Sequence, residues 1–354
     1  MMLPVIQREF VVQWHLTHRC DMRCRFCYIP HKLKSMSTEE IDFPTKAAVS
    51  ILDQISNFAK KLGLIPRINF SGGNPLLHPD FFHIVEQATE KGIRIGILGN
   101  PTASKRELKK LKELNIFRYQ ISIDGLEKTH DFFRGRGQFK NAIKFLKLEG
   151  KIGITRVVLS TVSEINYKEI PELAYYLYKN RLVEIYDFAR LVPIGEGTTF
   201  KNTLLSTEKF KWLLYGMFLK YKKLWEEGIK CHIGNKEPLW ALLYYELGIL
   251  NPEYKKIKRI RGGCSIGRTG LVIDVNGDIY PCRRAPIILG NIITDPNLTI
   301  EKAFVHLLKN FRIKENYECK DCKLFNICRG CPAISMALTN DVFNRDPNCW
   351  KMVK

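Results

Sequence analysis

Cysteines gather at two places in this chain, and that distribution limits what it can fold into more than any other feature. Of the 11 cysteines among 354 residues, three lie at 20–27, one at 231 and seven between 264 and 349. Clustered thiols without a secretory leader indicate metal binding rather than disulfides. Met1 to Pro4 shows no basic segment that leads into an apolar one. We therefore expect two metal-binding regions in a cytoplasmic chain.

The first group lies in the sequence CDMRCRFCY at 20–28, directly after the apolar segment Phe10 to Leu16. A Cys-x3-Cys-x2-Cys loop is able to wrap one metal centre, because each thiolate reaches inward from the same loop. A structural zinc ion closes with four ligands, and an ordinary iron–sulfur cluster takes four cysteines. Three thiolates therefore leave one coordination position for a ligand that is not protein. A zinc site with His15, His18 or His31 as the fourth ligand is the alternative.

Between residues 10 and 195, short apolar segments alternate about six times with segments of helical periodicity. We expect strands at 10–16, 67–70, 93–98, 117–123, 155–162 and 183–189, and helices at 38–40 with 44–62, 80–91, 104–114, 139–149 and 167–179. Such alternation predicts an α/β fold with a parallel sheet and helices outside it. In barrels built this way the site lies at the carboxyl ends of the strands.

The expected strands run into loops of small or polar residues. These loops are the cysteine loop, Gly72-Gly73, Gly99-Asn100, Asp124-Gly125 and Pro193 to Gly195. Because the carboxyl ends of parallel strands meet at one edge, we expect the loops to converge on one mouth.

The cysteine triplet, with Phe26 before its last cysteine and Tyr28 after it, resembles the radical S-adenosylmethionine (SAM) family. The resemblance covers about residues 10 to 200 and implies a partial six-fold (β/α) barrel. It also implies that Cys20, Cys24 and Cys27 hold a 4Fe–4S cluster, whose fourth iron chelates the amino and carboxylate groups of SAM. By the same resemblance, Phe26 belongs to the cofactor site.

The sequence SGGNP at 71–75 resembles the Gly-Gly-Glu-Pro motif that binds the SAM amino group in this family. Gly72 and Gly73 would let the backbone come close to a ligand, although a structural glycine pair is the alternative. Asn74 departs from the motif, because an amide oxygen accepts a hydrogen bond but brings no charge. SAM affinity is then expected to be lower, or a carbonyl takes over.

Residues 121–125 resemble the fourth-strand motif of the family, in which Ser122 and Asp124 would approach the methionyl and ribose part of SAM. Arg134, shortly after it, is a candidate for holding a carboxylate or an ordinary surface arginine. Asn100 stands where relatives have Thr-Asn-Gly. The order of these motifs behind the cysteine triplet supports the resemblance.

The second group of cysteines brackets a hairpin, because two short apolar runs flank Asn276-Gly277. This arrangement resembles the SPASM extension of radical SAM maturases, which holds two auxiliary 4Fe–4S clusters. The resemblance implies one cluster on Cys319, Cys322, Cys328 and Cys349, and another on Cys264, Cys282 and Cys331. The second would have an open or non-cysteine fourth position. Two zinc ribbons are the alternative.

Segments 206–227 and 236–247 have helical patterns, and Cys231 between them is a lone thiol or a metal ligand. We expect a radical SAM barrel over 1–200, a helical linker over 201–260 and a SPASM domain with its hairpin and helices over 261–354. Arg283 stands where some relatives carry an acidic base, which argues against a sulfatase-type mechanism. With Arg284 it suits an anionic substrate, or forms an ordinary surface pair.

The resemblance implies an enzyme that cleaves SAM to a 5′-deoxyadenosyl radical and takes hydrogen from a peptide, protein or cofactor precursor. Ferredoxin or flavodoxin is the expected electron donor. The two Gly-Asn-Pro motifs at 73–75 and 99–101 resemble maturases of tungsten-cofactor oxidoreductases. The Arg-x-x-Pro-x-Gly turn at 190–195 instead resembles haem and tetrapyrrole-pathway enzymes. Asn74 leaves a non-enzymatic iron–sulfur carrier or scaffold as a further alternative.

The formal net charge is +20, which indicates either a solvated surface or an acidic partner. The lysines are spread along the chain and match no nucleic-acid module, so nucleic acid is not an expected partner. No apolar run reaches the length of about 18 residues that a membrane helix needs. We therefore expect no membrane partner.

Overall fold

The computed structural model describes residues 9–29, 41–232, 236–250 and 263–351. The helical start expected at 38–40 and the candidate ligand His31 lie outside the described residues.

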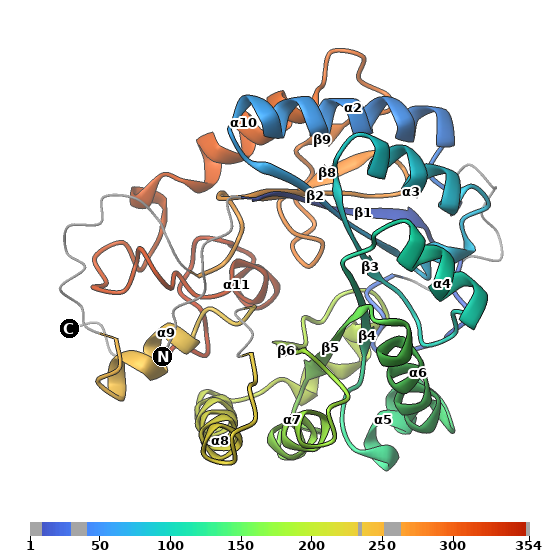
Figure 1. Ribbon diagram of the computed structural model, residues 1–354. Helices are drawn as coiled ribbons and strands as arrows, with labels where there is room; N and C mark the ends of the chain where they lie inside the picture. Colours follow the sequence, from blue (N-terminus) through green and yellow to red (C-terminus); the bar gives the residue numbers. More distant parts are fainter. Residues whose placement is uncertain (1–8, 30–40, 233–235, 251–262, 352–354) are drawn as a thin grey trace.

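A nine-stranded sheet forms the centre of the molecule, in the order β6-β5-β4-β3-β2-β1-β7-β8-β9 (Figure 1). Its strands are β1 (Glu9–Thr17), β2 (Ile65–Gly72), β3 (Arg94–Leu98), β4 (Arg118–Ser122), β5 (Thr155–Val162), β6 (Ile185–Arg190), β7 (Gly270–Ile273), β8 (Asp278–Tyr280) and β9 (Gly290–Asn291). All pairs from β6 to β7 are parallel, whereas β7–β8 and β8–β9 are antiparallel. The sheet curves but does not close, since β6 and β9 are its edges. The predicted partial barrel is confirmed.

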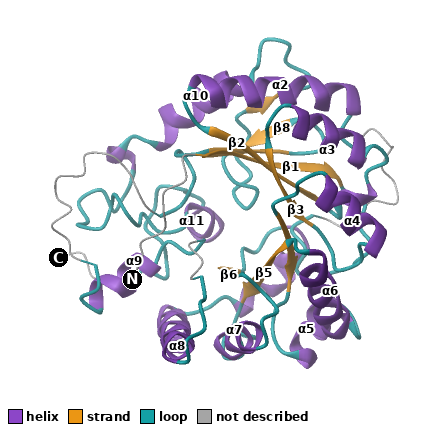
Figure 2. Ribbon diagram, viewed as in Figure 1, coloured by secondary structure: helices purple, strands orange, loops and turns teal. Residues whose placement is uncertain are grey.

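Helices cover the outer face of the curved sheet (Figure 2). On this face lie α2 (Thr45–Lys61), α3 (Phe81–Glu90), α4 (Lys105–Glu113), α6 (Gln138–Ile152) and α7 (Ile170–Lys179), with α5 (Glu127–Arg134) beside α6, α8 (Thr207–Glu226) beside α7 and α10 (Ile300–Phe311) beside α2. Helices α9 (Trp240–Glu246) and α11 (Pro332–Thr339) lie apart from this face, among the loops of the C-terminal region (Figure 1). Short 3₁₀ turns lie at Pro75–Leu77, Gly195–Thr203 and Lys314–Asn316. Helix α4 begins where the sequence provides a capping box, since Ser104 accepts from Glu107 N and Glu107 accepts from Ser104 N.

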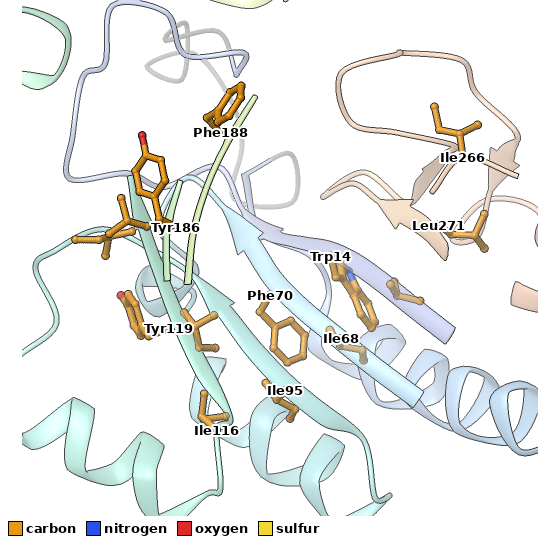
Figure 3. Packing of buried hydrophobic residues seen from close by; sticks show 14 of the residues in the cluster. Trp14, Ile68, Phe70, Ile95, Ile116, Tyr119, Tyr186, Phe188, Ile266 and Leu271 are labelled. Atoms are coloured by element: carbon orange, nitrogen blue, oxygen red, sulfur yellow. The ribbon is translucent and has the colours of Figure 1, made fainter. Parts of the chain in front are cut away.

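The strands alternate between an apolar outer face and a polar inner face. In β1, Trp14 is fully buried under the helices, whereas Gln13 is only half-buried (Figure 3). In β2, Ile68 and Phe70 pack outward and Asn69 lies between them. A parallel sheet packed on both faces would be apolar throughout. The polar inner face therefore indicates that the barrel interior is a site rather than a second core.

The C-terminal region joins the barrel through the sheet itself. Strand β7 pairs with β1, and a Cβ on Gly270 would lie 2.2 Å from the Val11 carbonyl oxygen. Helix α10 packs beside α2, where Phe304 meets Phe58 with ring centroids 5.7 Å apart, and Phe304 also meets Phe10 of β1 edge-on at 5.2 Å. The sheet thus runs across the expected division into a barrel, a linker and a C-terminal domain, and that division stays a prediction.

The predicted hairpin around Asn276-Gly277 is present as β7 and β8, with Ile273 paired to Ile279. Helix α5 was not expected, because its eight residues carry only a short apolar pattern. The helix expected over 236–247 begins only at Trp240, since the backbone before it follows the edge of β6 instead. Among the described residues, no helix combines the length and the apolar character that crossing a bilayer requires.

Candidate functional site

The cysteine loop lies at the carboxyl edge of the sheet, where the loops after other strands hold it. Gly73 N donates to the Thr17 carbonyl at 2.7 Å, and Asn74 N donates to the Arg19 carbonyl at 2.7 Å. On the other side, Glu196 N, after β6, donates to the Cys27 carbonyl at 2.7 Å. The loops after β1, β2 and β6 thus meet at one mouth, as the strand pattern predicts.

The glycine pair has a packing role. A Cβ on Gly72 would lie 2.1 Å from the Thr17 carbonyl oxygen, and one on Gly73 would lie 2.2 Å from that of Arg19. Gly72 also has a φ of +135°, which side chains rarely adopt. The pair is therefore needed to let the cysteine loop dock on β2. Its predicted contact with SAM stays a prediction.

Two side chains, one from the loop after β3 and one from the end of α5, contact the thiols of the cysteine loop. Asn100 Nδ2 lies 3.4 Å from Cys20 Sγ, and Arg134 Nη1 lies 3.4 Å from Cys24 Sγ. Burial raises the pKa of the Cys27 thiol to about 11. Donors and a cation beside sulfur are suited to thiolates that carry charge in an iron–sulfur cluster, and such contacts tune its potential.

A carboxylate lies beside Asn74, at the place where Asn74 itself brings no charge. Asn74 Nδ2 donates to Asp21 Oδ1 at 3.3 Å, and Asn100 Nδ2 donates to the same oxygen. Asn74 Oδ1 instead accepts from Leu76 N at 3.4 Å within its own loop. Sequence reasoning missed Asp21, because its partners are 53 and 79 residues away. The one available signal was an acidic residue inside the cysteine loop.

Asp124 is fully buried and holds Arg134 in place. Its carboxylate accepts from Arg134 Nε and, at 2.8 Å, from Thr161 N. Burial alone would lower the pKa of Arg134, but the Asp124 charge raises it, so the guanidinium stays charged. Arg134 also lies over the Phe26 ring, 5.5 Å from its centroid. Asp124 thus acts on the cysteine loop through Arg134. Whether Asp124 or the half-buried Ser122 contacts SAM stays a prediction.

The cysteines of the C-terminal region influence one another within two groups. Burial, together with the neighbouring thiols of Cys331 and Cys282, raises the pKa of Cys264 to about 12. Burial and the thiols of Cys322 and Cys349 raise that of Cys319 to about 11. Burial raises the pKa of Cys328, and the thiols of Cys349 and Cys319 raise it too. These groups correspond to the two ligand sets that the resemblance implies, and the ligand assignment itself stays a prediction.

A cation lies near thiols of both C-terminal groups. Arg284 Nη2 lies 4.0 Å from Cys331 Sγ, Lys351 Nζ lies 3.6 Å from Cys322 Sγ, and Arg345 Nη2 lies 3.7 Å from Cys349 Sγ. Thiolate-ligated clusters carry negative charge, which these cations would offset.

Two of the three histidines that were candidate zinc ligands face a carboxylate. His15 Nδ1 and His18 Nε2 face Asp274, at 3.0 and 3.4 Å from its Oδ1, rather than a thiol. Within the residues that the structure describes, no three His, Cys, Asp or Glu side chains converge on one ion. Thiolates that share one zinc at ~2.3 Å must lie roughly 4 Å apart. A multi-iron cluster takes cysteines that are farther from one another.

Two family models match the chain. The model of the radical SAM superfamily matches residues 14–176, and the SPASM model, an iron–sulfur cluster-binding domain, matches residues 264–332. The chain is also 31% identical to the Fe-coproporphyrin III synthase of Methanosarcina barkeri (strain Fusaro / DSM 804) over 360 residues, which is 96% of this chain and 87% of that protein. The chain belongs to the radical SAM superfamily.

One further relative and one solved structure are similar to this radical SAM chain over nearly its whole length. It is 24% identical to the mycofactocin maturase MftC of Mycolicibacterium smegmatis, over 95% of this chain and 81% of that protein. Its fold is similar to the solved structure of native anSMEcpe with bound AdoMet, with a TM-score of 0.72, 20% identity, and coverage of 96% of this chain and 94% of that one. The chain is therefore a radical SAM enzyme with a SPASM domain, and 4Fe–4S clusters and SAM are its cofactors.

The residues of the mouth fit these cofactors. Three half-buried thiols lie in one loop, with an amide donor and a guanidinium against two of them. The carboxylate of Asp21 and the cation of Arg134 are suited to the ammonium and carboxylate of SAM.

Cys231 has the surroundings of a structural thiol. It is half-buried against the hydrophobic core, where burial raises its pKa to about 11. The neighbouring Tyr178 hydroxyl donates to the His232 carbonyl at 2.7 Å.

Proposed function

We propose that this radical SAM enzyme acts on a tetrapyrrole that carries carboxylates. The observation that carries the proposal is the likeness to an Fe-coproporphyrin III synthase along 96% of the chain. The turn at 190–195, which resembles that of haem-pathway enzymes, supports it. A Cβ on Gly195 would lie 2.4 Å from the Tyr28 carbonyl oxygen, so this turn packs directly on the cysteine loop.

Cys20, Cys24 and Cys27 would hold the SAM-binding cluster. With one electron passed to it through that cluster, bound SAM would supply the chemistry of the family, cleavage to methionine and a 5′-deoxyadenosyl group able to take a hydrogen atom from the substrate. Within the protein, Asn100 and Arg134 place a hydrogen-bond donor and a charge beside two of the thiols. Both groups restrain the loop, and the charge of Arg134 opposes the rise that burial causes in the pKa of Cys24.

Asp21 would bind the ammonium of SAM in place of the glutamate that Asn74 replaces. The two amides that donate to Asp21 fix its orientation. Arg134, anchored by Asp124, would face the carboxylate of SAM. Gly72, Gly73, Phe26 and Ser122 complete the proposed SAM site.

The auxiliary clusters would be held by Cys319, Cys322, Cys328 and Cys349, and by Cys264, Cys282 and Cys331. The grouping of the thiols and their neighbouring cations support this assignment. An electron donor of the ferredoxin or flavodoxin type would reduce the clusters.

A peptide or protein maturase is the second candidate, which the likeness to the maturase MftC favours. The narrower assignment to maturases of tungsten-cofactor oxidoreductases stays a prediction, since no comparison given above tests it. A non-enzymatic carrier does not agree with the family, whose matched relatives are synthases and maturases.

The test compares substrates in anaerobic turnover with a strong reductant. Extracted tetrapyrrole precursors and acidic peptides are added separately, and 5′-deoxyadenosine and substrate mass are measured together. Faster 5′-deoxyadenosine formation with a mass change only in the tetrapyrrole supports the proposal. A mass change only in a peptide would overturn it in favour of the second candidate.

A further inference from the structure

The floor of the barrel interior carries more positive than negative side chains. Glu9 of β1 pairs with Arg67 of β2 at 2.5 Å and with Arg94 of β3 at 2.7 Å. Arg118 of β4 donates instead to the amide oxygen of Asn69 at 2.9 Å. Two guanidiniums thus share one carboxylate at the amino ends of the strands, and a third is bound to a neutral amide.

Lys236 adds a further cation above this floor. It precedes α9, and its segment follows β6, because Lys236 N donates to Asp187 Oδ2 at 3.1 Å. Its side chain crosses to β4, where Nζ donates to Gln120 Oε1 at 3.3 Å. Gln120 precedes Ser122 by two residues on the same inner face, so Lys236 lies about 7 Å below the mouth, measured along the strand.

Lys236 is exposed to water, although charged groups from several elements lie near it. Burial, together with the charges of Arg118, Arg284 and Arg67, lowers the pKa of its ammonium to about 8 against the opposite effect of Asp187. These groups belong to β4, β2, β6 and the segment after β8. A side chain that has these groups around it and is reached by water is accessible to a ligand.

The charge of this space is not balanced by the described residues that face it. Arg283 lies near the thiol of Cys27, and Arg284 lies near those of Cys331 and Cys282. The negative charge of the clusters would offset these two cations. Of the rest, Arg67, Arg118 and Lys236 lie near the carboxylates of Glu9 and Asp187. The Nε atoms of Arg67 and Arg118 are buried without a hydrogen-bond partner in the described structure. Enclosed cations without counter-charges are unfavourable, so an anionic ligand would stabilise this arrangement.

We propose that the barrel interior binds a substrate through at least two of its carboxylates, and that Lys236, oriented by Gln120, contacts one of them. The inference rests on the proposed function for the identity of that substrate. A carboxylate held at Lys236 would place the body of the molecule between the floor and the mouth, where hydrogen abstraction is expected.

Equilibrium dialysis of the cluster-loaded enzyme tests the inference with three probes. These are Fe-coproporphyrin III, whose ring carries propionates, its methyl ester, which lacks the charges, and a polyglutamate peptide. The variants are Lys236→Met, Lys236→Arg and the matched control Lys222→Met, a surface lysine paired only with Glu226 on its own helix. Iron content and SAM cleavage without substrate report whether each variant folds and carries its clusters.

We expect the wild type to bind the acid and not the ester. Loss of one charge-assisted hydrogen bond should weaken binding of the acid roughly tenfold to a hundredfold in Lys236→Met, whereas Lys236→Arg and Lys222→Met should retain it. Equal binding by Lys236→Met, equal binding of the ester, or no binding of any probe would overturn the inference.

The two proposals fail separately. Binding of polyglutamate alone, lost in Lys236→Met, would keep the carboxylate site and overturn the tetrapyrrole substrate. Failure of the wild type to cleave SAM, with binding that still depends on Lys236, would overturn the proposed function and leave the carboxylate site standing.

Discussion

Arg190 at the end of β6 forms a bidentate pair with Asp346 near the C-terminal end of the chain, with both hydrogen bonds at 2.7 Å. The same guanidinium binds Glu237, and Asp346 accepts from the backbone N of Cys331 at 2.7 Å. All four residues are buried. One arginine therefore ties a barrel strand, the segment before α9 and a proposed cluster loop together.

Replacing this arginine should destabilise the protein strongly. In Arg190→Met the carboxylates of Glu237 and Asp346 remain buried without their cation, which costs about 3–5 kcal/mol. Arg190→Lys should retain only part of the lost stability, because lysine cannot form the bidentate pair. Denaturant unfolding measures the loss, with the exposed Arg136→Met as the control. Equal stability of Arg190→Met and the control would contradict the role given to Arg190.

SAM affinity should depend on Asp21. In Asp21→Asn the charge beside Asn74 disappears, and SAM should bind roughly 10–100-fold more weakly if one charge-assisted hydrogen bond is lost. The double variant Asp21→Asn/Asn74→Glu returns the carboxylate to the mouth and should regain affinity. Calorimetric titration of SAM measures both, and Asp53→Asn, a surface residue paired with Lys91, is the control. Unchanged binding by Asp21→Asn would remove Asp21 from the SAM site.

Binding of Fe-coproporphyrin III should weaken as the pH rises through about 8, the lowered pKa of Lys236. Below this pH the ammonium is charged and attracts a carboxylate, and above it the amine is neutral. Bound carboxylate raises the pKa, so the midpoint should move upward as the ligand concentration increases. The Lys236→Arg variant should bind Fe-coproporphyrin III with the same affinity on both sides of this pH, because its guanidinium stays charged. The same decline in Lys236→Arg would assign the titration to another group.

Glu149 of α6 should lower stability at neutral pH. It is fully buried, both of its carboxylate oxygens lack a hydrogen-bond partner in the described structure, and burial raises its pKa well above 4.5. Because the folded state then binds the proton more tightly than the unfolded state, this group loses stability as the pH rises. Glu149→Met should stabilise the protein by about 1–3 kcal/mol at pH 7 and less at low pH. Thermal unfolding at both pH values, against the exposed Glu113→Met, measures this. A stabilisation that does not change with pH would show that the charge is not its cause.

The arrangement of the barrel was predictable because it follows from local pattern. The strands of the barrel show an apolar outer row, and β2, β3 and β4 run into Gly72-Gly73, Gly99-Asn100 and Asp124-Gly125 at the same edge. The meeting of Gly73, Asn74 and Glu196 with the cysteine loop follows from that topology.

The residues that complete the site were not predictable, because they act through distant partners. The role of Asp21 depends on its contacts with Asn74 and Asn100. The role of Arg190 depends on its contact with Asp346, which is 156 residues away. The pairing of β7 with β1 joins segments about as far apart as His15 and Asp274, which are separated by 259 residues. No periodicity within one segment encodes such contacts.

The most direct test of the account is formation of 5′-deoxyadenosine from SAM by the anaerobically purified enzyme with a strong reductant. The wild type and Cys231→Ala, which changes a thiol outside the three groups, should both form it. The triple variant Cys20→Ala/Cys24→Ala/Cys27→Ala should form none and should lose about four irons, the content of one cluster. Product from the triple variant, or none from iron-loaded wild type, would contradict the assignment of SAM cleavage to this loop.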